Sequence, residues 1–170
     1  MADMPAKRDI GVLFKVAEAA GKVGIARKTK AIDARMAKPG EIIVTYITGD
    51  GKETQSRPAD AGDMVVRNRC PETGNEQYLV SSKKFVARYE EPHGKPDADG
   101  WSEYRPLAPE MLYFIVDKTE GDFVFTAPWG EEMVAKPGDA IIRNPDDPAD
   151  TYRVAAKSFK CTYEIVKGVR

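Results

Sequence analysis

The chain has 170 residues, of which 42% are hydrophobic and 31% are charged, and its formal net charge is −1. These values are typical of a globular protein with one or two small domains. No apolar run approaches the roughly 18–20 residues of a membrane-spanning helix, which argues against membrane insertion. Because no secretory signal is visible at the N-terminus, we expect a cytoplasmic protein.

The charge is unevenly distributed along the chain. Residues 1–40 hold nine Lys or Arg and four acidic residues, so the rest of the chain is acidic. A basic arm of this kind can contact nucleic acid. Phe14 is its only aromatic residue and belongs to an apolar helical stripe. We therefore favour a solvated basic face and regard nucleic-acid binding as unlikely.

The first predicted element is an amphipathic helix. Asp9 precedes apolar residues spaced i, i+3, i+4 and i+7 from Ile10, and Gly21 follows the last of them. This pattern predicts a helix of about three turns, with Asp9 as its N-cap and Gly21 as its terminator.

Beyond residue 28 the hydrophobic pattern is that of β-strands. Strands are predicted at 31–35, 42–47, 52–57, 64–66 and 77–80, with a tight hairpin turn at 49–52. Ser81-Ser82 opens a short turn of helix. A polar segment, 91–108, is rich in Gly and Pro and precedes further strands that begin at Met111.

Two stretches of the chain repeat one pattern. A Gly-Asp pair is followed by three aliphatic residues, Arg-Asn, and then a Tyr, a Phe and a second Tyr. The first copy is Gly62-Asp63, Arg67-Asn68, Tyr78, Phe85 and Tyr89; the second is Gly138-Asp139, Arg143-Asn144, Tyr152, Phe159 and Tyr163. The two copies are 76 residues apart at the Gly-Asp pair and 74 apart at the tyrosines and the phenylalanine. Loops absorb insertions and strands do not, so a two-residue difference confined to one loop predicts a duplicated structural unit.

These elements predict a mainly β (α+β) protein. We expect two tandem, similar, small antiparallel β modules packed together, with an N-terminal amphipathic helix. The expected divisions are an N-terminal helix and basic leader at 1–27, a first module at 28–91, a linker at 92–107 and a second module at 108–166.

The order of the motifs also carries a resemblance. Arg27-Lys28 leads into the first copy, Pro137-Gly138-Asp139 stands in the second, and both copies close on Phe-x-x-x-Tyr-Glu. This order resembles the small bacterial and phage proteins named for their Pro-Gly-Asp-Tyr-Gly motif, here as a diverged tandem repeat. Both copies lack the Tyr-Gly that completes the motif. The resemblance implies a fold and a microbial, intracellular setting, and it implies no particular activity.

No residue cluster has the pattern of a catalytic or metal site. His93, the single histidine, lies in the polar segment and is expected to be solvated. Cys70 and Cys161 are expected to be free thiols, Cys70 in a loop and Cys161 in a strand. The carboxylates at 146–150 lack the spacing of a calcium loop and are expected to lie in a hairpin loop. We expect no catalytic residue, no metal and no cofactor.

The glycine and aspartate pairs of the repeat are predicted to be structural. Asp63 follows Gly62, and Asp139 follows Gly138, at the entry to a buried strand. A carboxylate in this position can accept backbone N–H groups and hold the turn.

The Arg-Asn pairs are the candidate binding residues. Each arginine could contact a phosphate or carboxylate with its asparagine fixing orientation, or each asparagine could take a left-handed turn while its arginine pairs with a neighbouring acid. Trp129, in a predicted hairpin tip, is a candidate exposed contact. The expected site is a groove between the modules, lined by Arg67, Asn68, Arg143, Asn144 and Trp129.

The leading hypothesis is a non-catalytic, intracellular binding or accessory protein of bacterial or phage type, whose partner is another protein or a small anionic ligand. The alternative is an enzyme acting on a nucleotide or other phosphorylated small molecule, with Asp63 or Asp139 as base. A third hypothesis is nucleic-acid binding through the basic N-terminal arm. The oligomeric state does not follow from the sequence.

Overall fold

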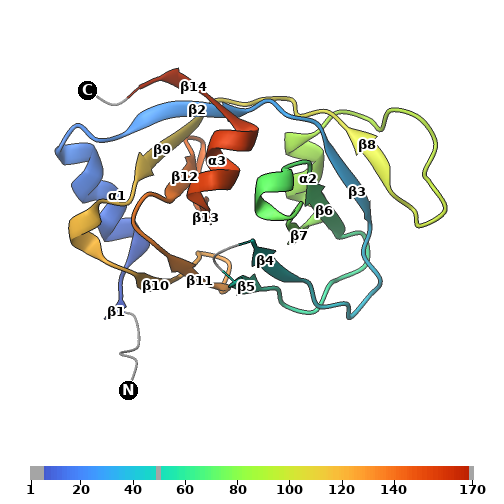
Figure 1. Ribbon diagram of the computed structural model, residues 1–170, viewed down its shortest axis with the longest axis horizontal. Coiled ribbons are helices and arrows are strands. Elements are labelled where there is room, and N and C mark those ends of the chain that lie inside the picture. Colours follow the sequence, from blue (N-terminus) through green and yellow to red (C-terminus); the bar gives the residue numbers. More distant parts are fainter. Residues whose placement is uncertain (1–5, 49–50, 169–170) are drawn as a thin grey trace. The chain divides into compact units, whose positions relative to one another are not determined.

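The computed structural model describes residues 6–48 and 51–168, with only the backbone described for 51–54. The predicted turn at 49–52 therefore lies partly outside the described residues. The chain is mainly β and divides into two compact units (Figure 1). Unit 1 contains Met1–Arg27, Glu110–Lys160 and Glu164–Arg170, and unit 2 contains Lys28–Pro109 and Cys161–Tyr163. Within the described residues, no helix is both long and apolar enough to cross a membrane.

Unit 1 is built on two sheets. One has the strand order β13-β12-β9-β2-β14 and the other the order β1-β10-β11. The last residue of β2 and the junction of α3 with β14 belong to unit 2. The elements in chain order are β1 (Ala6–Lys7), α1 (Ile10–Ala19), β2 (Gly24–Lys28), β9 (Met111–Ile115), the 3₁₀ turn η2 (Lys118–Glu120), β10 (Phe123–Thr126), β11 (Glu132–Ala135), β12 (Ala140–Asn144), β13 (Asp147–Val154), α3 (Ala156–Thr162) and β14 (Tyr163–Lys167).

Helix α1 covers the core of unit 1. The Asp9 carboxylate accepts a hydrogen bond from the Val12 N–H at 3.1 Å and so caps the first turn. The stripe that contains Leu13 and Phe14 is buried against β9 and β10, beside which α1 lies in Figure 1. Phe14 meets Phe114 edge to face at 5.3 Å between ring centroids.

Unit 2 consists of a four-stranded sheet, a hairpin and a helix. The sheet has the order β7-β6-β3-β8, and β4 pairs with β5. Strand β8 lies within residues 92–107, the segment that we expected to be a linker, and pairs with β3. The elements are β3 (Ile32–Met36), β4 (Val44–Ile47), β5 (Gly51–Gln55), β6 (Met64–Asn68), the 3₁₀ turn η1 (Pro71–Thr73), β7 (Gln77–Val80), α2 (Ser82–Arg88) and β8 (Ser102–Tyr104).

The two Gly-Asp turns have the same local geometry. Gly62 and Gly138 have φ values of 90° and 93°, in the region that favours glycine. The Asp63 carboxylate accepts from the Asp60 N–H at 2.9 Å, and the Asp139 carboxylate accepts from the Lys136 N–H at 2.8 Å. Each aspartate thus holds its own turn by bonding the backbone three residues earlier.

Cys70 lies in a loop, as expected, but the structure corrects the expected strand at Cys161 and the expected free thiols. Cys161 lies in α3, because the buried residues around it, Ala155, Ser158, Phe159 and Thr162, follow the helical period. Cys161 is not a free thiol either, since it forms a disulfide with Cys70 and the two Cα atoms are 6.1 Å apart. The expectation that Cys70 and Cys161 are free thiols is therefore wrong. Another difference is that β13 begins at Asp147, within the segment expected to be a hairpin loop.

Candidate anion-binding pocket

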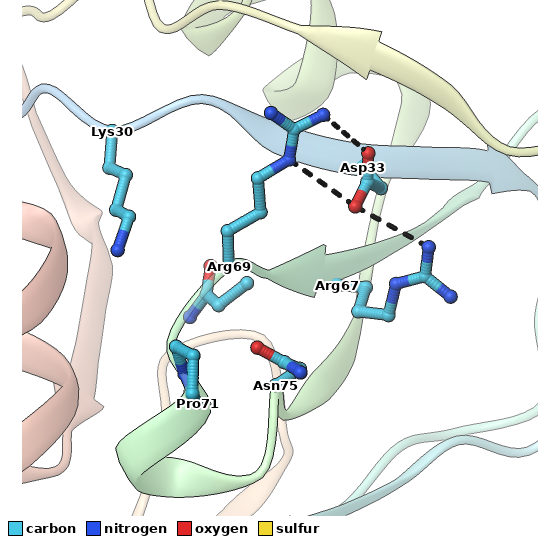
Figure 2. Close-up of a pocket in the computed structure, with 7 residues that line it drawn as sticks. Lys30, Asp33, Arg67, Arg69, Pro71 and Asn75 are labelled. Atoms are coloured by element: carbon cyan, nitrogen blue, oxygen red, sulfur yellow. Dashed lines mark hydrogen bonds and ion pairs between the residues drawn. The ribbon is translucent and has the colours of Figure 1, made fainter.

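A polar cavity of about 560 Å³ lies within unit 2, where β6 ends and η1 begins. Its lining residues come from three segments: the connection before β3 and β3 itself, the end of β6 with the residue after it, and the η1 loop. They are Lys30, Asp33, Arg67, Asn68, Arg69, Pro71 and Asn75 (Figure 2). The lining thus contains three cationic side chains and one carboxylate.

The strand period brings both arginines to one side of β6. Arg67 and Arg69 are two residues apart, and alternate residues of an extended chain point the same way. In the β3–β6 pairing, Asp33 stands directly opposite Arg67. The buried Val65 and Val66 anchor the strand from which Arg67 projects. As Figure 2 shows, the two guanidinium groups converge on the Asp33 carboxylate.

Asp33 is held by both arginines. Arg69 Nη2 lies 2.8 Å from Asp33 Oδ1, and Arg67 Nη2 lies 3.4 Å from Asp33 Oδ2. Burial raises the pKa of Asp33, but the hydrogen bonds and charges of Arg69 and Arg67 outweigh it and lower the pKa overall. The carboxylate is therefore ionised at neutral pH and orients both guanidinium groups at the pocket wall. Arg69 also pairs with Glu103, at 3.0 Å.

Arg67 is further fixed by an aromatic ring. Its Cζ atom lies 4.1 Å from the centroid of the Trp101 ring, a cation–π contact. The Trp101 side chain thus reports on the position of a residue that lines the pocket.

Lys30 differs from the two arginines in its partners. The Lys30 Nζ atom lies 3.6 Å from Cys161 Sγ, and no carboxylate of the described chain forms an ion pair with it. Figure 2 shows its side chain extending from the segment that precedes β3, apart from the Asp33 cluster. Lys30 is therefore the cation of the pocket whose charge is least compensated.

Asn68 connects the pocket to a buried polar network. Its Oδ1 atom accepts from Lys28 Nζ at 2.9 Å, and its Nδ2 atom donates to Glu76 Oε1 at 2.8 Å. Lys28 Nζ also donates to the hydroxyl groups of Tyr78 and Tyr89, at 2.6 and 3.1 Å. Burial raises the pKa of Tyr89, but the Lys28 charge and the hydrogen bonds outweigh it and lower the pKa overall. The network fixes the orientation of the Asn68 amide.

The η1 loop closes the other side of the pocket. Asn75 has a φ of 53°, a left-handed conformation that asparagine tolerates better than most residues. Its N–H donates to the Cys70 carbonyl at 2.9 Å, which folds the loop back on the end of β6. Pro71 begins the 3₁₀ turn, and its ring adds an apolar surface to the lining.

The remaining sequence candidates lie in unit 1 and do not line this pocket. Arg143 donates from Nε to Thr151 Oγ1 at 3.0 Å and stacks on Phe14, with its Cζ 4.2 Å from the ring centroid. Asn144 accepts from the Asp146 N–H at 2.9 Å, within a turn. Trp129 is 36% exposed, and its Nε1 donates to Glu131 at 3.0 Å.

Two of the sequence candidates, Arg67 and Asn68, line this pocket, whereas Lys30, Asp33 and Arg69 were not among the candidates. The spacing of Arg69, two residues after Arg67 and beyond the β-branched run, was an available signal. The pairing of Asp33 with both arginines depends on the register of β3 against β6, which the sequence does not display.

Comparisons of this chain with protein-family models, with curated proteins and with solved structures found no match. In the part of the chain that the structure describes, no group of three or more His, Cys, Asp or Glu is placed to hold a metal ion.

Proposed function

We propose that the protein is a non-catalytic binding protein that takes a small anionic ligand, carrying a phosphate or carboxylate group, in the pocket of unit 2. The observation that carries the proposal is the lining itself, with Lys30, Arg67 and Arg69 set against the single carboxylate of Asp33. Guanidinium groups bind phosphate and carboxylate oxygens through paired N–H donors.

Preorganisation supports this function. Asp33 orients the guanidinium groups of Arg67 and Arg69 before any ligand arrives, so less side-chain entropy is lost on binding. Lys30 supplies a charge that no described carboxylate neutralises. A ligand anion would be attracted to Lys30 first and would share the arginine donors with Asp33.

The test is a binding screen with inorganic phosphate, sulfate, citrate and nucleoside monophosphates. A ligand that binds only the folded protein raises its stability by mass action, by roughly 1.4 kcal/mol at ten times its Kd. Binding is also followed by the fluorescence of Trp101, in protein that carries Trp129→Phe, because Trp101 stacks on Arg67.

The variant that removes the site is Lys30→Gln with Arg69→Gln. We expect it to weaken binding of the best anion by about tenfold or more, since two charged donors are lost. The matched control is Arg27→Gln, which also removes a half-buried, acid-paired arginine (Arg27 Nε lies 3.4 Å from Glu164) but lies outside the pocket. Equal weakening in both variants, or no binding of any anion by the unmodified protein, would contradict the proposal. Turnover of a bound anion would favour an enzyme instead.

We also propose that the two units are diverged copies of one module, related to the Pro-Gly-Asp-Tyr-Gly proteins of bacteria and phages, and that the protein is cytoplasmic. The duplication is supported by the strand orders β7-β6-β3-β8 and β13-β12-β9-β2, and by α2 and α3, which are equal in length and equivalent in the repeat. A crystal structure tests the duplication, and we expect the two units to superpose on each other.

A further inference from the structure

The Cys70–Cys161 disulfide lies at the wall of the pocket. Cys70 stands between Arg69 and Pro71, which both line the cavity. Cys161 Sγ lies 3.6 Å from the ammonium group of Lys30, a third lining residue. A change in the oxidation state of this pair therefore acts directly on residues of the pocket.

The two sulfur atoms differ in their access to reagents. Cys70 is 0% exposed, whereas Cys161 is partly exposed. The thiolate of an external dithiol therefore reaches Cys161 Sγ first. Its attack forms a sulfur–sulfur bond to Cys161, breaks the Cys70–Cys161 bond and releases Cys70, which takes up a proton.

The second thiol of the same reagent then completes the reduction. It attacks the reagent's own sulfur in the mixed disulfide, expels Cys161 as a thiolate and leaves the reagent as a cyclic disulfide. The protein gains two electrons and one proton, which Cys70 holds, and the second proton of the dithiol goes to solvent. A lysine ammonium beside a cysteine favours its thiolate form, so Lys30 stabilises this product.

We propose that reduction of the Cys70–Cys161 disulfide weakens anion binding, because the Cys161 thiolate pairs with the Lys30 charge that the ligand uses. The inference rests on the proposed function. In the oxidised protein Cys161 is neutral and Lys30 is available to a ligand. In the reduced protein an internal anion occupies that position and repels a second one.

The first experiment measures the Kd of the pocket for inorganic phosphate, in oxidised protein, in protein reduced with dithiothreitol, and in reduced Cys161→Ser. We expect reduction to raise the Kd of the unmodified protein by roughly threefold to tenfold, the effect of one unit charge at a partly solvated site. Reduced Cys161→Ser also lacks the cross-link but carries no thiolate, so it should bind nearly as tightly as the oxidised protein.

The outcomes separate the two proposals. If the oxidised protein binds no phosphate or other probe anion, the proposed function fails. If it binds equally well before and after reduction, only the redox inference fails. Weak binding by reduced Cys161→Ser would also overturn the inference, because the cross-link and not the thiolate would then set the affinity.

A second experiment examines the thiolate without any ligand. In Cys70→Ser protein, Cys161 is the only thiol, and its rate of alkylation by iodoacetamide at neutral pH is compared with that of Cys70→Ser carrying Lys30→Gln. We expect the protein with Lys30 to react about threefold faster, because a larger fraction of its Cys161 is thiolate. The lower nucleophilicity of this thiolate offsets only part of the gain. Lys30→Arg should restore the faster rate, and equal rates with and without Lys30 would overturn the charge pairing.

Discussion

Asp139→Ala is expected to destabilise unit 1 strongly, because it removes an ion-pair partner of a buried arginine. The Arg153 side chain is 1% exposed, and its Nη2 atom lies 2.6 Å from Asp139 Oδ2. The same carboxylate accepts from the N–H groups of Lys136, at 2.8 Å, and Ala156, at 3.0 Å. Removing one partner of a buried ion pair costs about 3–5 kcal/mol. We therefore expect the free energy of unfolding to fall by about 4 kcal/mol.

The equivalent turn of unit 2 supplies a matched control. Asp63 accepts from the Asp60 N–H at 2.9 Å and pairs with Arg57, also at 2.9 Å. The Arg57 side chain is 42% exposed, so water can solvate it when the carboxylate is removed. Asp63→Ala loses the turn hydrogen bond and a weakly contributing ion pair, and it should cost only about 1–2 kcal/mol.

The assay is a urea titration that reports each unit separately. The chain has two tryptophans, Trp129 in unit 1 and Trp101 in unit 2, so Trp101→Phe protein reports unit 1 and Trp129→Phe protein reports unit 2. Equal losses for Asp139→Ala and Asp63→Ala would refute the argument that burial of the arginine determines the cost.

Two further predictions concern unit 2. Lys28→Met removes the charge that opposes the effect of burial on Tyr89, so the pKa of this phenol should rise. Titration followed by ultraviolet absorbance measures this pKa. An unchanged or lower value would contradict the role given to the Lys28 charge. Glu41, hydrogen-bonded to Arg35 and to the Lys38 N–H, has its pKa lowered from 4.5 to about 2, so its interactions stabilise the folded state above pH 4.5 and are lost as the pH falls toward 2. When the free energy of unfolding is measured as the pH falls from 4.5 toward 2, Glu41→Gln should lose about 1 kcal/mol less than the unmodified protein. Identical pH profiles of the two proteins would count against this ion pair.

Local sequence patterns were sufficient to predict elements whose stabilising contacts lie within one short segment. Asp9 and the spacing of the apolar residues after it specify α1, because an N-cap and a buried stripe act within three turns of chain. Asp63 and Asp139 hold their turns through backbone groups three residues away, as the repeat predicted.

The pocket required information that no local pattern contains. Asp33 meets Arg67 only because β3 pairs with β6 in one register, and a shift by one residue would turn its side chain to the other face of the sheet. Cys70 and Cys161, 91 residues apart, meet only in the folded chain. The sequence by itself therefore determined α1, the strands from β3 to β7 and the two Gly-Asp turns. Tertiary structure decided which charges face each other, because pairing across strands depends on long-range register and not on neighbours along the chain.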